Sequence, residues 1–109
     1  RVAWASADDP RPHWIRMDFP APRRVGKVTV HWALDGGVRY RSRDVRVEVR
    51  DGESWKAVDL HEEGIDANNE RTVFSFEPVT AESLRIYQPA SGGPAGRPDI
   101  LWVTEVQVE

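Results

Sequence analysis

The sequence of 109 residues contains no cysteine, and this absence excludes disulfide bonds and thiolate-ligated metal sites. Its apolar runs are only a few residues long, far short of the roughly 20 that a membrane-spanning helix needs. Charge of one sign is also not in excess, because 15 basic and 18 acidic residues leave a net charge of −3. Basic residues lie among acidic ones, so the electrostatic field of a nucleic-acid-binding protein is missing. We therefore expect neither a nucleic acid nor a membrane as a partner.

Catalytic motifs are also missing from the sequence. It has no Gly-rich phosphate loop, no nucleophile elbow and no Ser/His/Asp arrangement. Its adjacent carboxylates, Asp8-Asp9 and Glu62-Glu63, are typical of a solvated surface rather than of two carboxylates facing each other across a cleft. The three histidines do not share a metal-ligand spacing. We predict that the chain is not an enzyme.

What the chain does have is alternation of apolar and polar residues, the pattern of half-buried strands. In the clearest case Val45, Val47 and Val49 alternate with charged residues, and Asp51-Gly52 then predicts a hairpin turn. Pro20-Ala21-Pro22 is expected to end the first strand, because proline lacks the N–H that a strand ladder needs. The predicted strands are 14–19, 25–34, 45–50, 55–60, 72–76, 83–88 and 100–108. Together they indicate one all-β sandwich domain.

The connections between these strands alternate between long and short. The long ones are 7–13, 33–44, 61–71 and 89–99, and the short ones are 20–23, 51–54 and 77–82. If each strand reverses the direction of the last, every second connection falls at the same end of the sandwich. Binding residues usually lie on loops held by a rigid scaffold. The pattern therefore predicts a module that binds its ligand with the long-loop end.

Tyr40 is the main candidate for a ligand contact. It lies in a long loop outside any predicted strand, and Arg39 and Arg41 flank it. An exposed aromatic ring between arginines is a stacking surface with hydrogen-bonding arms; the alternative is a tyrosine packed over the edge of the sandwich. Together with Arg43, the two arginines offer planar forks for carboxylate or sulfate groups. The alternative for them is a solvated loop balanced by neighbouring aspartates.

Other candidates lie on the same set of loops. Asn68 offers donors and acceptors for hydroxyl groups, although asparagine is also common in turns. His13 and His61 fall on the long-loop end. Arg97 ends a Gly-rich segment that looks able to close over a ligand; the alternative, which is more common for such a segment, is a plain long hairpin loop. Four tryptophans lie in predicted strands among aliphatic neighbours, which favours core packing over a role as sugar platforms: Trp14, Trp32, Trp55 and Trp102.

Several short motifs, taken in order, resemble one known family. They are Trp4-Ala5-Ser6, Pro12 to Phe19, Val25 to Val30, Val45 to Trp55, Leu84-Arg85-Ile86 and Thr104 to Val108. Their order and spacing resemble the discoidin, or coagulation factor V/VIII type C, superfamily, and most closely its bacterial family-32 carbohydrate-binding modules. The resemblance covers nearly the whole chain. It implies an antiparallel jelly-roll β-sandwich of the galactose-binding-like kind.

The resemblance also implies a function. It implies a non-catalytic carbohydrate-binding module, covalently linked to the catalytic domain of a secreted bacterial polysaccharide-processing enzyme. The alternative is a structural module that packs against a neighbouring catalytic domain without binding sugar, which an exposed apolar patch on one sheet face would favour. Residues 1–109 are expected to form a single domain, excised from a larger protein and lacking the usual first strand. The expected ligand-binding residues are Tyr40, Arg39, Arg41, Asn68, His13, His61 and Arg97.

Two structural expectations follow from the resemblance alone. Many members of the family hold a structural calcium ion near the chain ends, and Glu105 matches one of its ligands. Members also pair the aspartate of the 14–19 motif with the arginine of the Leu-Arg-Ile motif. The resemblance therefore implies an ion pair between Asp18 and Arg85.

Overall fold

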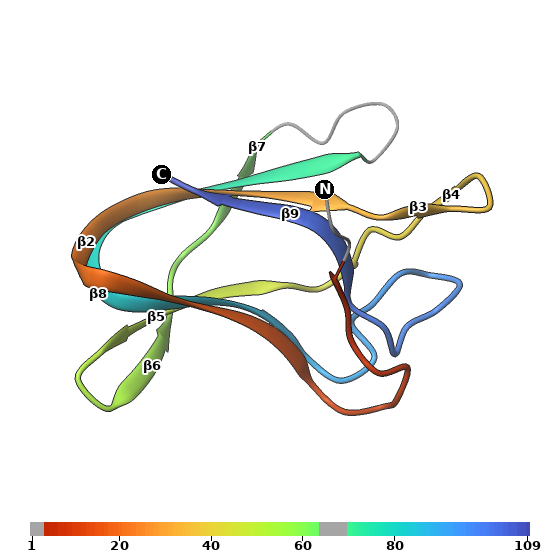
Figure 1. The fold of residues 1–109 in the computed structure, drawn as a ribbon, viewed down its shortest axis with the longest axis horizontal. Coiled ribbons are helices and arrows are strands. Elements are labelled where there is room, and N and C mark those ends of the chain that lie inside the picture. The colour runs from red at the N-terminus through yellow and green to blue at the C-terminus, as the bar shows by residue number, and fades with distance from the viewer. Residues whose placement is uncertain (1–3, 64–69) are drawn as a thin grey trace.

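A computed structural model describes residues 4–63 and 70–109 of the chain. These residues form nine strands and no helix, so they contain no helix that could cross a membrane. All of the strand pairings are antiparallel (Figure 1). The strands are β1 (Trp4–Ala5), β2 (His13–Trp32), β3 (Leu34–Asp35), β4 (Val38–Arg39), β5 (Arg46–Asp51), β6 (Ser54–Ala57), β7 (His61–Glu63), β8 (Arg71–Gln88) and β9 (Trp102–Val108).

Strands β2 and β8 are much longer than the others, and they pair with each other along nearly their whole length. Both strands bend, so that one continuous sheet folds over into two layers, as Figure 1 shows where β2 and β8 curve. One layer has the order β6, β5, second half of β8, first half of β2. The other has the order β7, first half of β8, second half of β2, β9, β1. This is the antiparallel β-sandwich that the sequence predicts.

Two of the expected short turns are bends within continuous strands. The expectation that β2 ends at Pro20-Ala21-Pro22 is wrong, and so is the expected turn over 77–82. The ladder between β2 and β8 is interrupted between Asp18 and Arg23, so the missing N–H groups of the two prolines cost no ladder bond. The chain still changes layer at these bends. The predicted alternation of long and short connections therefore survives.

The core lies between the two layers and is built from the inward-facing residues of each strand. Its most deeply buried members are Val25, Val28, Val30, Trp32, Val47, Leu84, Ile86 and Leu101. Among the five tryptophans, all within the described ranges, only Trp32 is buried; it is 1% exposed and donates from Nε1 to Thr72 Oγ1 at 2.9 Å. Core packing is the wrong interpretation for Trp14, which is 48% exposed. Trp14 alternates with the inward-facing Ile15, so it must lie on the outer face.

Three of the long loops gather at one end of the sandwich, opposite the β5–β6 hairpin (Figure 1). The backbone N–H of Arg43 donates to Gly92 O at 2.9 Å, which joins the loop after β4 to the loop after β8. Arg97 Nη2 donates to Asp8 Oδ2 at 2.7 Å, which joins that second loop to the loop after β1. The structure thus confirms that these long connections share one end.

Candidate functional site

A hollow with a volume of about 580 Å³ opens at the long-loop end. Residues 38–43 line one side of it, and residues 94–97 line the other. Four of the predicted ligand-binding residues are among its walls: Arg39, Tyr40, Arg41 and Arg97. The structure therefore brings the central part of the predicted site together from two loops that are more than 50 residues apart.

The first wall is carried by a small hairpin, formed by β3 and β4, within the expected long connection 33–44. β3 and β4 pair across Gly36 and Gly37, whose φ angles of 57° and 77° are those of a primed turn that glycine adopts without strain. Tyr40 follows β4 directly, and its N–H donates to Ala33 O at 2.8 Å, which closes the base of the hairpin. The sequence feature that predicts this hairpin is the Asp35-Gly36-Gly37 turn motif between the apolar residues Leu34 and Val38.

The second wall is held in place by its glycines rather than left loose. Gly92, Gly93 and Pro94 are buried, and a Cβ on Gly93 would come within 2.6–2.8 Å of three backbone carbonyl oxygens. Arg43 reaches across from the first wall, and its Nε donates to Gly93 O at 2.7 Å. The first half of the 91–97 segment is therefore pinned to the scaffold, against the expectation of a segment that closes over a ligand.

Tyr40 forms the aromatic wall of the hollow, and its ring packs on that of Trp102. The two ring centroids lie 4.9 Å apart at an interplanar angle of 34°, and Arg97 Cζ lies 5.5 Å from the Tyr40 ring and 5.8 Å from the Trp102 ring. Tyr40 is half-buried. Its ring packs over the edge of the sandwich, as one of the two interpretations of this tyrosine has it, and it also borders the hollow, where the other interpretation places a ligand. Sequence reasoning assigned Trp102 to the core. Its position between the buried Leu101 and Val103 was the signal that it faces the other way.

The arginines of the hollow differ in how their donors are used. Arg97 is paired with Asp8 at 2.7 Å, and the hydrogen bond to that carboxylate raises the pKa of Arg97. Arg41 Nη2 lies 3.6 Å from Glu62 Oε2, a looser contact. Arg39 Nη1 donates to a backbone carbonyl at 3.1 Å. Within the part of the chain that the structure describes, the Nε atoms of Arg39 and Arg41 are buried and have no hydrogen-bond partner.

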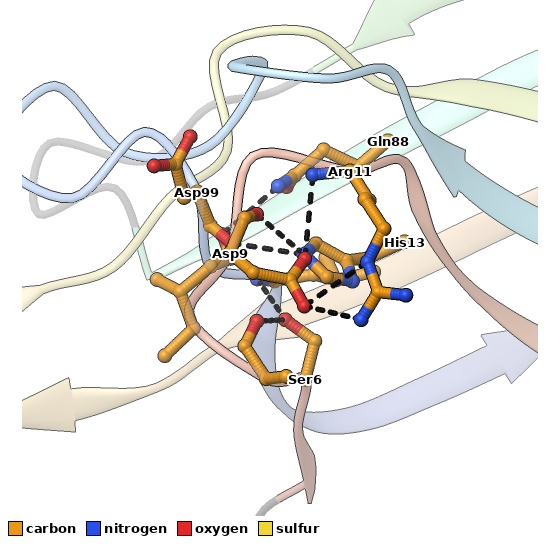
Figure 2. A network of polar contacts seen from close by, with 9 residues as sticks. Ser6, Asp9, Arg11, His13, Gln88 and Asp99 are labelled. Atoms are coloured by element: carbon orange, nitrogen blue, oxygen red, sulfur yellow. Dashed lines mark hydrogen bonds and ion pairs between the residues drawn. The ribbon is translucent and has the colours of Figure 1, made fainter.

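His13 lies outside this hollow and ties loops together instead, as Figure 2 shows. Its side chain is 10% exposed, and its Nε2 lies 3.1 Å from Asp9 O and 2.9 Å from Asp99 O. Carbonyl oxygens only accept, so Nε2 carries the hydrogen and donates it. Arg11 Nη2 in turn donates to Asp9 Oδ2 at 2.6 Å (Figure 2). This network positions the loop end of the sandwich.

The remaining predicted residues do not line the hollow where the structure describes them. His61 is exposed on β7 opposite Ser75. Asn68 lies outside the described residues. Glu105 lies on β9 opposite His31, and its Oε2 is 3.5 Å from His31 Nε2. In residues 4–63 and 70–109 no group of three or more His, Cys, Asp or Glu side chains is placed to hold a metal ion. Calcium binding at Glu105 stays a prediction from the resemblance.

The expected ion pair between Asp18 and Arg85 is wrong. Arg85 Nε and Nη2 each lie 2.6 Å from Glu48 Oε1. Asp18 instead accepts from Arg16 Nε at 2.7 Å and from Ser83 Oγ at 2.6 Å, and these two hydrogen bonds hold the pKa of Asp18 below its usual value. The register explains the choice, because Glu48 stands directly opposite Arg85 whereas Asp18 stands opposite Ser83.

Aromatic rings surround this ion pair on the outer face of the sheet. Arg85 Cζ lies 4.5 Å from the ring centroid of Trp55, 5.0 Å from that of Tyr87 and 5.4 Å from that of Trp14. Trp14 and Tyr87 are cross-strand neighbours, stacked 6.1 Å apart at 13°. The outer face thus carries a cluster of three partly exposed rings, none of which lines the hollow. Core packing is therefore also the wrong interpretation for Trp55.

Known proteins share this fold. The structure is similar to that of a β-galactosidase from Streptococcus pneumoniae (TM-score 0.75, 19% identity, 99% of this chain and 75% of that one). It is also similar to chitosan-binding module 1 of a chitosanase/glucanase from Paenibacillus (0.73, 20%, 99% and 76%). A third similar structure is the family 32 carbohydrate-binding module of NanJ from Clostridium perfringens, in complex with galactose (0.68, 16%, 98% and 75%). Curated protein sequences give no match.

These structural likenesses establish the jelly-roll fold, since their identities are too low to establish more. The family is established by the sequence itself, because the family model of the F5/8 type C domain matches residues 1–101. Two of the three structures named above are carbohydrate-binding modules described with the saccharide that they bind. The chain belongs to the F5/8 type C domain family and is a non-catalytic domain.

Proposed function

We propose that the chain is a carbohydrate-binding module that holds a sugar in the hollow between residues 38–43 and residues 94–97. One observation carries the proposal: a half-buried aromatic wall stands beside several guanidinium groups at the loop end of the sandwich. Apolar C–H faces of a sugar ring pack on aromatic rings, and hydroxyl groups accept hydrogen bonds from arginine donors. Modules of the same fold bind saccharides as different as chitosan and galactose, which supports the class of ligand rather than one sugar.

In this proposal the residues of the hollow have separate tasks. The exposed part of Tyr40 contacts the sugar ring, and Trp102 beneath it fixes the orientation of the tyrosine. Arg39 and Arg41 supply donors from one side, and Arg97 supplies them from the other. Asn68 stays a predicted contact, and His13 acts on the site only by holding the loops.

The proposal includes attachment to a secreted bacterial enzyme that processes polysaccharides. The chitosan-binding module of similar fold comes from a chitosanase/glucanase, which supports this context. A single shallow site need bind only weakly, because tethering to an enzyme that acts on a polymer raises the effective concentration to about the millimolar range.

A glycan array followed by titration calorimetry on the best ligand tests the proposal. We expect Tyr40→Ala to weaken glycan binding at least about tenfold, equivalent to about 1.4 kcal/mol. Tyr87→Ala is the matched control, because Tyr87 is the other tyrosine, is also half-buried and does not line the hollow. Melting curves would show that both variants fold. Unchanged binding by folded Tyr40→Ala would contradict this site.

The outer-face ring cluster favours a second candidate function, namely packing against a neighbouring domain without sugar binding. Trp14 is 48% exposed beside Tyr87, on the outer face of the sheet near the start of β2. A protein that carries both domains tests it: packing predicts that Trp14→Ser separates two unfolding transitions that otherwise coincide, whereas Tyr40→Ala leaves them together. Independent unfolding of the two domains in the unmodified protein would rule out this candidate.

A further inference from the structure

We propose that the hollow prefers an anionic sugar, one that carries a carboxylate or a sulfate group, over a neutral one. This inference rests on the proposed sugar-binding function and concerns the same hollow. The anionic group would lie against the arginines, while the apolar part of the sugar ring would lie against Tyr40.

The first argument is the charge of the walls. Four arginines line the hollow, namely Arg39, Arg41, Arg43 and Arg97, and no aspartate or glutamate is among the described residues that line it. Only two of these arginines have a carboxylate partner among the described residues, Arg97 with Asp8 and Arg41 with Glu62. The hollow therefore keeps an excess of positive charge in a chain whose net charge is −3. Asp35 and Asp44, the aspartates that flank these arginines in the sequence, do not line the hollow.

The second argument is the kind of donor that Arg39 and Arg41 offer. Their Nε atoms are buried from solvent and have no acceptor among the described residues, so a ligand in the hollow would contact the terminal Nη groups of the two planar guanidinium forks. Both residues line the hollow. Each oxygen of a carboxylate or sulfate can accept more than one hydrogen bond, and a charge-assisted bond is roughly twice as strong as one to a neutral hydroxyl. An anionic substituent is thus the ligand group that best matches these two arginines.

The third argument is that the scaffold holds the arginines in place before a ligand arrives. Arg43 donates from Nε to Gly93 O at 2.7 Å and from Nη2 to Ser91 O at 2.8 Å. Arg97 lies against the Tyr40 ring at 5.5 Å and is also fixed by Asp8. Side chains that are already ordered lose less conformational entropy when a ligand binds. The positive charge of the hollow is therefore largely preorganised.

A matched pair of probes tests this inference: a galacturonate oligosaccharide, and the same oligosaccharide with its carboxylates methyl-esterified. A sulfated galactose oligosaccharide serves as a third probe, to distinguish carboxylate from sulfate. We expect the acid to bind at least about tenfold more tightly than its ester in low salt, equivalent to about 1.4 kcal/mol. This preference should shrink as the salt concentration rises, because the Debye length falls to about 8 Å at physiological ionic strength.

Substitutions then locate the preference in the hollow. We expect Arg39→Gln to weaken binding of the acid severalfold more than binding of the ester, and so to reduce the acid-over-ester ratio severalfold. Arg39→Lys keeps the charge but loses the planar fork, and should restore part of the ratio. Arg24→Gln is the matched control, because it also removes one positive charge. Arg24 is exposed on the bend of β2 and lies outside the hollow.

The outcomes separate the two proposals. Equal binding of acid and ester, or equal effects of Arg39→Gln and Arg24→Gln, would overturn the anionic preference and leave sugar binding standing. Absence of binding to every acidic and neutral glycan on the array would overturn both.

Discussion

The ion pair between Glu48 and Arg85 allows a direct test of how the outer face of the sandwich is held together. Both contacting nitrogens of Arg85 lie 2.6 Å from Glu48 Oε1, and the two side chains are only 18% (Arg85) and 11% (Glu48) exposed. Trp14, Trp55 and Tyr87 cover the guanidinium. Glu48→Gln would leave Arg85 largely shielded from water and without a carboxylate.

The expected magnitude follows from this burial. Breaking a fully buried ion pair by removing one partner costs about 3–5 kcal/mol. The expected loss for Glu48→Gln is smaller, about 2–3 kcal/mol, because the pair is partly exposed. The cation–π contacts, which contribute about 0.5–2 kcal/mol, also still stabilise the guanidinium after the carboxylate is removed. Arg85→Met should cost a similar amount. Because the two side chains interact directly, the double variant should lose about 1.5–2 kcal/mol less than the two single losses added together.

Urea denaturation followed by far-UV circular dichroism measures these free energies of unfolding. A second cycle, with Asp18→Asn and Arg85→Met, is the control, and its coupling energy should stay below about 0.5 kcal/mol. A larger coupling for Asp18 than for Glu48 would show that the pairing implied by the family resemblance is the real one. A coupling near zero for Glu48 and Arg85 would refute the reasoning from burial.

Three further predictions concern the core, pH and calcium. Trp32→Phe removes the indole N–H that donates to Thr72 at a buried site, and we expect urea denaturation to show a loss of about 1–3 kcal/mol. Ser83→Ala removes the main hydrogen bond that lowers the pKa of Asp18, so an NMR pH titration should show that pKa rising toward its ordinary value. Because the folded-state pKa of Asp18 is depressed, its contribution to stability is present at neutral pH and is lost as the pH falls through that folded pKa; Ser83→Ala should make this acid-side loss smaller. The calcium ion implied by the family resemblance, with Glu105 as a ligand, predicts that removing calcium with EDTA lowers the melting temperature by several degrees; a melting temperature unchanged within about 1 °C would contradict it.

Much of the scaffold could be predicted from local pattern. The alternation at Val45, Val47 and Val49 correctly gave one face of a strand, and Asp51-Gly52 correctly gave the hairpin between β5 and β6. The alternation of long and short connections correctly predicted that Tyr40 and Arg97 lie at the same end of the sandwich. These successes share a cause: side chains alternate between the faces of a strand, and antiparallel strands reverse direction, so sequence order alone carries the information.

The less accurate predictions concern contacts between residues far apart in the chain. Periodicity could not show that Trp102 lies under Tyr40, that His13 ties loops together, or that Arg85 pairs with Glu48. Nor could Pro20 reveal whether the chain turns or bends, because that depends on where the ladder between β2 and β8 is interrupted.

The sequence by itself thus determined the β-class of this chain, its family and the end of the sandwich that carries the long loops. It did so because these properties depend on residue order and on which face of a strand each residue occupies. Only the tertiary structure decided which rings and arginines share the hollow and which carboxylate neutralises each arginine. Those choices depend on register between distant strands and on how closely glycine lets two loops approach, and neither is visible in local pattern.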